Sequence, residues 1–335
     1  MRVRGKASRR HRCGRRRLRG LVAERLEPRR LLAAVVDECV VSALPYGFVP
    51  SGVPTGADEA PDIGPAEATV PPSGNYQIEA LRSGYKWGIT NVTYSFFSGG
   101  SYYGGEGAPR QVSEAVKANV RTILTNVIAP LINVTFTEVA DSATSYGLIR
   151  YLCSTSAGYA YAYYPSGGDT NTLSSADVVG DVVLNTSYDV VSTDTNSFQN
   201  GPGSHGYQSL IHETCHALGL KHPGDYNGSS TGDGPFLPLG EDNWDNSLMS
   251  YNFFSGYEPV TPMGYDLQAL QYIYGAKSAT RSGDSTYTFA RSDFYTSNDG
   301  AIGGTLSAIS KGTLWDGGGT DTADFSGLPS AAGGY

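Results

Sequence analysis

The sequence predicts an α+β fold in which helices pack against a mixed, twisted β-sheet. Three observations lead to this prediction: a long stretch of apolar residues at helical spacing, several short stretches typical of strands, and a second helical stretch that carries histidines. The chain has 335 residues, enough for one large domain or two smaller ones.

The first helix is expected between residues 108 and 132, as a core helix behind the sheet. Its apolar residues are Val112, Ala115, Val116, Val120, Ile123, Leu124, Val127 and Ile128. Pro109 fits a first helical turn and Pro130 marks the end, because proline lacks the N–H that a helix interior needs. Strands are expected at 132–139, 147–151 and 178–184. The second helix is expected to begin near Gly206 or Tyr207 and to end at Gly219.

The second helix carries the pattern H-E-x-x-H-x-x-G-x-x-H. His212 and His216 are four residues apart, so they lie on one helix face and can bind the same ion. Gly219 permits the turn that brings His222 back as a third ligand. Three protein ligands leave one position for water, which is the arrangement of a catalytic zinc ion. Glu213 lies beside the first ligand and is the candidate general base.

A methionine follows the histidines in the segment Ser247-Leu248-Met249-Ser250-Tyr251. Met249 lies 27 residues after His222 (249 − 222) and is one of three methionines in the chain. Zinc proteases of the metzincin group carry a methionine-containing turn beneath the metal, downstream of the zinc helix. We therefore expect Met249 in such a Met-turn. The alternative is an ordinary core methionine, since this flexible side chain often fills gaps.

These motifs resemble the serralysins, secreted bacterial zinc proteases with the metzincin fold. The zinc motif continues as His-Pro-Gly-Asp-Tyr-Asn, and the later turn reads S-x-M-S-Y in both. The resemblance covers roughly residues 76 to 327. Segments 84–87 and 92–96 resemble the entry into the family's first strand, 180–185 its substrate-lining edge strand, and 271–276 the end of its protease domain.

The resemblance implies a secreted zinc-dependent endopeptidase that acts on extracellular proteins. Glu213 would activate a zinc-bound water, and Tyr251 would stabilise the oxyanion of the substrate. The implied partners are protein and peptide substrates, and the implied state is a monomer. An extended substrate would pair with the edge strand Asp181, Val182, Val183, Leu184 and Asn185. The alternative is a catalytically inactive surface adhesion module on the same fold, and another metzincin branch is a third option.

The chain departs from the family at Cys215, where serralysins usually have glycine. The simplest interpretation is a buried, packed thiol, and the alternative is a redox or metal-linked role. The cysteines are Cys13, Cys39, Cys153 and Cys215, with no spacing that predicts a disulfide framework. A latency role for Cys39 is a further alternative, although its surroundings do not resemble a known cysteine switch. His205 is expected to be cleft-side or structural and not a ligand.

The region 277–335 resembles the start of the family's calcium-binding β-roll. It is rich in glycine and aspartate, and no run of G-G-x-G-x-D repeats follows in it. By the resemblance, one Ca²⁺ would be held by Arg281, Gly283, Ser285, Asp316, Gly318, Gly319 and Asp321. Carboxylate and carbonyl oxygens are the ligands that calcium prefers. The alternative is a surface Asp-Gly loop without metal.

The charge is divided unevenly along the chain. Residues 1–34 hold 13 basic residues and two acids, a net charge of +11, whereas residues 35–335 hold 11 bases and 30 acids, a net charge of −19. An acidic body offers no basic surface for nucleic acid, and no apolar stretch is long enough for a transmembrane helix. Residues 26–32 resemble the LEPR-XLL element of exported bacterial surface proteins, with a basic anion-binding arm as the alternative.

The expected domains follow from these features. Residues 1–34 form a basic leader or export element, and 35–75 a linker or propeptide rich in proline, glycine and acids. Residues 76–276 form the catalytic domain, and 277–335 the start of the calcium-binding region. The expected location is extracellular or on the cell surface.

Overall fold

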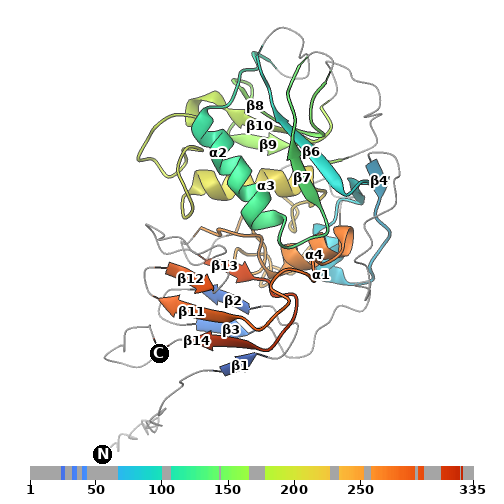
Figure 1. Cartoon of the computed structure of the whole chain (residues 1–335). Helices are drawn as coiled ribbons and strands as arrows, with labels where there is room; N and C mark the ends of the chain where they lie inside the picture. Colours follow the sequence, from blue (N-terminus) through green and yellow to red (C-terminus); the bar gives the residue numbers. More distant parts are fainter. Residues whose placement is uncertain are drawn as a thin grey trace, which may run out of the picture.

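The computed structural model describes the protein in twelve segments, which Figure 1 shows in colour. They are residues 24–26, 32–35, 40–43, 67–99, 107–142, 145–165, 178–226, 234–252, 258–290, 293–297, 311–324 and 326. Cys13 and Cys39 lie outside them, as does most of the LEPR-XLL-like element.

A five-stranded mixed sheet forms the upper part of the molecule (Figure 1). Its strands, in sheet order, are β7 (Thr135–Glu138), β6 (Asn91–Phe96), β8 (Ile149–Ser154), β10 (Asp181–Asn185) and β9 (Ala160–Ala162). The first four run parallel to one another, and β9 runs antiparallel to β10. The predicted α+β class with a mixed sheet is thus confirmed.

The long predicted helix is present but begins later than expected. It consists of α2 (Glu114–Thr122), which continues into a π-helical turn, η1 (Ile123–Ile128). The placement of Pro109 in its first turn was wrong, because Ser113 caps the helix and its hydroxyl accepts the N–H of Val116 at 3.3 Å. The serine hydroxyl accepts the backbone N–H of Val116 in the first turn, whereas a proline side chain has no acceptor for this N–H. The end before Pro130 is confirmed.

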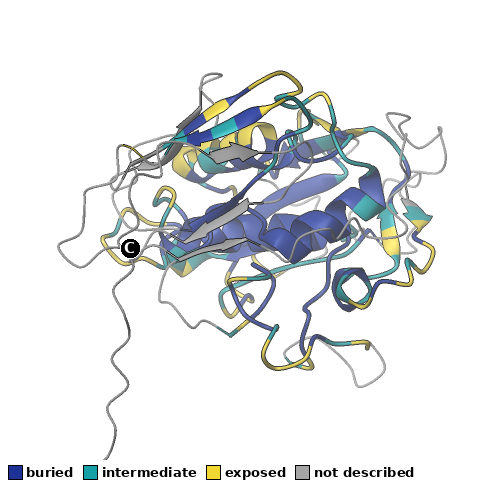
Figure 2. Cartoon of the chain, turned by 90° about the horizontal axis from the view of Figure 1, so that it is seen from below, coloured by how far each residue is buried: buried dark blue, intermediate teal, exposed yellow. Residues whose placement is uncertain are grey.

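The histidine-bearing helix is α3 (His205–Ala217), which packs against β9 and β10. Ser204 caps its first turn, and all of its residues from Gly206 onward are buried. The shorter helices are α1 (Tyr76–Leu81), α4 (Gly264–Tyr274) and the 3₁₀ turn η2 (Thr186–Tyr188). Figure 2 shows a buried interior of helix and strand, which includes α3 and α4, whereas α2 exposes part of its surface.

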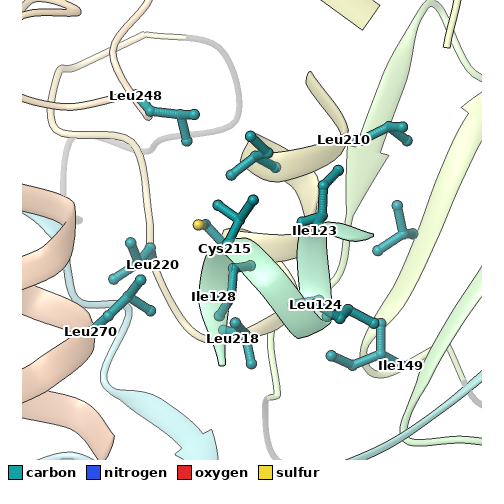
Figure 3. Close-up of a cluster of buried hydrophobic side chains, with 14 of the residues drawn as sticks. Ile123, Leu124, Ile128, Ile149, Leu210, Cys215, Leu218, Leu220, Leu248 and Leu270 are labelled. Atoms are coloured by element: carbon teal, nitrogen blue, oxygen red, sulfur yellow. The ribbon is translucent and has the colours of Figure 1, made fainter. Parts of the chain in front are cut away.

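The core lies between α3, the α2–η1 helix and the sheet. Figure 3 shows part of it, with side chains from η1, β8, α3 and the segment after α3 in mutual contact. Cys215 lies in this cluster with no exposed surface, among Ile128, Leu218 and Leu220. The interpretation of Cys215 as a packed thiol fits this position.

Two of the smaller sheets pair strands from the N-terminal part of the sequence with strands from its C-terminal part (Figure 1). One has the order β1 (Glu24–Leu26), β14 (Asp321–Asp324), β11 (Thr286–Ala290) and β12 (Asp293–Ser297). A second has the order β13 (Lys311–Leu314), β2 (Leu32–Val35) and β3 (Val40–Ala43). A two-stranded sheet pairs β4 (Glu67–Thr69) with β5 (Tyr85–Trp87). Parts of the expected leader and linker therefore pair with the C-terminal region.

Across the segments that the structure describes, we find no helix with the length and apolar character needed to cross a membrane.

Candidate metal centre

Three histidine side chains converge at the C-terminal half of α3. Nε2 of His222 lies 3.1 Å from Nε2 of His212 and 3.0 Å from Nε2 of His216, and all three rings are buried. The turn between helix and third histidine depends on Gly219, which has a φ of 97°. A Cβ there would lie 2.2 Å from the carbonyl oxygen of Tyr85, so a larger residue would not fit.

The ring hydrogens point away from the centre of this cluster. Nδ1 of His212 lies 3.1 Å from the carbonyl of Leu248, and Nδ1 of His216 lies 2.7 Å from that of Leu220. A carbonyl only accepts, so both Nδ1 atoms carry the hydrogen and both Nε2 atoms present lone pairs to the centre. Burial and the neighbouring histidine lower the pKa of His216 to about 3, which keeps that ring neutral.

The arrangement fits a divalent metal ion. The Nε2 atoms of His212 and His216 both face His222, which has at most one hydrogen to share between them. A cation at the centre satisfies all three lone pairs. Tetrahedral zinc with Zn–N bonds of about 2.0–2.1 Å separates its nitrogen ligands by about 3.3 Å, close to the two distances seen here. Among the described residues, these three histidines form a group able to hold a metal.

Glu213 is buried next to the first histidine. Its Oε2 atom has no hydrogen-bond partner among the described residues. Burial raises the pKa of this carboxyl to about 8. A buried carboxyl oxygen without a partner, on the residue that directly follows the first histidine, is a second sign that the site accommodates a cation and its water.

The expected Met-turn is held by a residue that sequence reasoning missed. Asp266, in the first turn of α4, accepts hydrogen bonds from the hydroxyl of Ser247 at 2.6 Å and the N–H of Leu248 at 2.6 Å. Leu248 is the residue whose carbonyl orients His212, and Met249 is fully buried. The available signal was one acid within an apolar helical stretch, which does not say what the acid contacts.

Tyr251 lies beside two of the histidines. Its ring centre is 4.6 Å from that of His222 and 5.9 Å from that of His212. The ring of Tyr226 stacks on the ring of Tyr251, with ring centres 4.8 Å apart. Tyr226 also lies within the segment that continues the histidine motif, but no role was predicted for it from the sequence.

Comparison with curated proteins decides the family. The chain is 32% identical to Metalloprotease AprA of Pseudomonas entomophila over 291 residues, which is 78% of this chain and 54% of that protein. It is 36% identical to Serralysin C of Dickeya chrysanthemi over 217 residues, 59% of this chain and 41% of that protein. It is 31% identical to Serralysin of Proteus mirabilis over 259 residues, 71% and 50% of the two chains.

The chain belongs to the serralysin family. It spans about half the length of the curated relatives that it matches. Of the protein-family profiles compared with it, none matches.

One expectation drawn from the serralysins was wrong. The segment Asp181, Val182, Val183, Leu184 and Asn185 is not an edge strand, because β10 pairs with β8 on one side and with β9 on the other. Asp181 to Leu184 are buried. The outer strand of the described sheet is β9, and just beyond it the ring of Tyr164 lies 5.6 Å from that of His216. A strand of three residues gave too short a pattern to be predicted.

In this chain, the residues expected to bind calcium come from two segments that lie next to each other, 281–285 and 316–321. Ser285 donates its N–H to Asp321 at 2.9 Å, and Asp316 accepts the N–H of Gly318 at 2.9 Å. A Cβ at Gly319 would lie 2.5 Å from the carbonyl oxygen of Gly283, which shows how closely the segments approach. Arg281 lies in the same turn, with a φ of 50°.

His205 lies outside the metal-binding group, at the first position of α3. Its ring stacks on Tyr159 at 5.6 Å and Trp244 at 6.3 Å, and its Nδ1 lies 3.4 Å from Oε2 of Glu258. These contacts are consistent with the expected structural or cleft-side role.

Proposed function

We propose that this chain is a zinc-dependent endopeptidase that cleaves peptide bonds in extracellular proteins. The observation that carries the proposal is the convergence of the three histidine Nε2 atoms, together with the buried carboxyl oxygen of Glu213 that lacks a hydrogen-bond partner among the described residues. Membership of the serralysin family, whose curated members are named as metalloproteases, supports the same conclusion.

Each residue has a distinct part in the proposed reaction. A zinc ion held by His212, His216 and His222 would supply Lewis acidity and would lower the pKa of a water molecule bound to it. Glu213 takes a proton from that water and later delivers it to the amine that leaves. Tyr251, beside the histidines, donates a hydrogen bond to the negative charge that develops on the substrate oxygen. The Met-turn, held by Asp266, keeps His212 in the orientation that the metal needs.

The substrate would bind in an extended form along β9. β9 is the outer strand of the described sheet, and an extended peptide can add to the outer strand of a sheet as a further strand. The segment that contains β9 reaches the metal centre at Tyr164, so a peptide paired with it passes the histidines. In this proposal the substrate pairs with β9, and not with segment 181–185 as was expected from the sequence.

Casein cleavage by the full chain tests the proposal. We expect cleavage that a zinc chelator abolishes, and a loss of at least about 1000-fold in kcat in Glu213→Gln with the bound zinc retained. Glu114→Gln is the matched control, because Glu114 is an exposed residue on α2 far from the histidines in sequence. Cleavage by Glu213→Gln at the wild-type rate would refute the role of Glu213. Zinc binding without any cleavage would instead favour an adhesion module.

Calcium is a second proposed cofactor, held by the turn segments 281–285 and 316–321. Burial and the negative charges of Asp316 and Asp284 raise the pKa of Asp321, so these carboxylates repel one another unless a cation lies between them. We expect millimolar Ca²⁺ to raise the melting temperature by several degrees, and Asp321→Asn to remove most of that shift. An equal shift in both proteins would contradict the site. Secretion and a monomeric state remain part of the proposal.

A further inference from the structure

The backbone of Tyr251 is held by side chains from other parts of the chain. Its N–H donates to the phenol oxygen of Tyr226 at 3.0 Å, and that phenol donates to Oδ1 of Asp242 at 3.0 Å. The side chain of Asn252 donates to the other oxygen of Asp242 at 2.9 Å. Asp242 is buried, so water does not compete strongly for these bonds.

Trp244 holds the same stretch from a second direction. Its indole N–H donates to the carbonyl of Ser250 at 2.6 Å, and its backbone N–H donates to the carbonyl of Asn252 at 3.0 Å. The residues before and after Tyr251 are therefore both fixed. The side chain of Tyr251 is 43% exposed, so its own burial does little to fix its position.

Tyr226 connects this arrangement to a proposed metal ligand. Its ring lies 4.8 Å from the ring of Tyr251 at an interplanar angle of 23°, and 5.7 Å from the ring of His222. One side chain thus contacts the backbone of Tyr251, the ring of Tyr251 and the ring of His222.

Gly224 makes the contact between Tyr226 and Asp242 sterically feasible. A Cβ at position 224 would lie 2.0 Å from Cε1 of Tyr226 and 2.4 Å from Oδ2 of Asp242. Any larger residue would push the two side chains away from their present positions. The short chain between His222 and Tyr226 therefore contains the glycine that this pair requires.

We infer that Tyr226 and Asp242 are positioning residues, which hold the phenol of Tyr251 beside the metal-binding histidines. The inference rests on the proposed function of Tyr251 and adds the means by which that side chain is placed. A group that stabilises developing charge must be held to within a fraction of an ångström, and small displacements are costly to rate. The phenol of Tyr251 acts on charge that develops only in the transition state, so we expect the effect in kcat and not in KM.

Tyr226→Phe in the full, zinc-loaded chain tests the inference, because it keeps both ring contacts and removes only the hydroxyl. We expect unchanged zinc content, a kcat on a casein-derived peptide lower by on the order of 10-fold, and a KM within about twofold of wild type. Amide hydrogen exchange at Tyr251 should become at least about 10-fold faster. Tyr272→Phe is the matched control, since its hydroxyl donates to the carbonyl of Pro71 at 3.2 Å on the surface, and it should change none of these values.

A second variant and a double-mutant comparison separate positioning from general stability. Asp242→Asn should reproduce the faster exchange at Tyr251. In a Tyr251→Phe background, Tyr226→Phe should cause little further loss in kcat, because the phenol that it places is gone. A full additional 10-fold loss in that background, or unchanged exchange at Tyr251, would overturn the inference. If the wild-type chain cleaves nothing, the proposed function fails, and the exchange rates still decide whether Tyr226 holds Tyr251.

Discussion

At the scale of single residues, Cys215 shows how a departure from a family pattern is accommodated. The thiol, which belongs to α3, lies in the packed core with no exposed surface, and burial raises the pKa of the thiol well above its ordinary value. A thiol that stays protonated is a poor nucleophile and a poor metal ligand. The side chain therefore contributes volume to the core, and its burial favours the packed thiol over the redox alternative.

Cys215→Ala should lower the free energy of unfolding by about 1 kcal/mol, because a buried sulfur is replaced by a small cavity. Proteolytic activity and its sensitivity to oxidants should stay at the wild-type level. Urea unfolding and casein cleavage before and after peroxide treatment measure both quantities. A variant that became resistant to an oxidant that inactivates the wild type would restore the redox role.

The convergence of the three histidines could be predicted because their spacing is local. The helical period brings His212 and His216 together, and a glycine turn returns His222 within six residues. The supporting residues could not be predicted in this way. Asp266 contacts Leu248 from 18 residues away and Tyr226 contacts Tyr251 from 25 residues away, and no short pattern encodes either meeting.

At the scale of elements, α1 depends on a carboxylate at its N-terminal end. Glu79 accepts hydrogen bonds from the hydroxyl of Ser73 at 2.7 Å and from Nε of Arg82 at 2.8 Å, and Arg82 also donates to the carbonyl of Val70 at 3.0 Å. Burial acts to raise the pKa of Glu79, but the bonds from Arg82 and Ser73 outweigh it and lower the pKa to about 2. The ionised carboxylate thus joins the helix to the segment that precedes it.

Glu79→Gln should therefore destabilise the protein in a pH-dependent way. The folded-state pKa of about 2 lies below the ordinary value of 4.5, so the stabilisation is fully present above pH 4.5 and is lost as the pH falls toward 2. At pH 7 we expect a loss on the order of 2 kcal/mol. Urea unfolding of both proteins between pH 2.5 and 7 measures the difference, and a gap that did not narrow in acid would contradict this origin.

The order of strands was the least predictable property at this scale. Segments 84–96, 132–139, 147–151 and 178–184 all contain strands, because their residue patterns are local. Which strand lies at the edge depends on non-local pairing, and here the three residues of β9 displaced β10 from that position.

At the scale of the whole molecule, the C-terminal region contacts the chain close to segment 247–251, the expected Met-turn. Lys311 of β13 is fully buried, and its Nζ donates to Oδ1 of Asp245 at 2.6 Å. The carbonyl of Lys311 accepts the N–H of Val260 at 2.8 Å, in the segment that leads into α4. The segments on both sides of the Met-turn therefore contact β13.

The two partners of this ion pair should differ in their effect on stability. Asp245→Asn leaves a buried ammonium without its nearest carboxylate, whereas Lys311→Met removes the buried charge and leaves a carboxylate that is 45% exposed. We expect Asp245→Asn to cost about 1–3 kcal/mol more than Lys311→Met. Urea unfolding measures the free energy of unfolding of each variant. Equal losses in the two variants would show that the ion pair does not account for the stability at this position.

The pairing of β1 with β14 cannot form until long after β1 has been synthesised. Glu24 is paired with Ala323, 299 positions later (323 − 24). At roughly 5–20 residues per second, a ribosome needs about 15–60 s to make the chain between them. Throughout that interval the strand from the expected export element lacks its partner, and it is accessible to any cellular factor that binds extended chain. Because β14 must be synthesised before the two strands can pair, the time available for such binding cannot end before Asp324 is made.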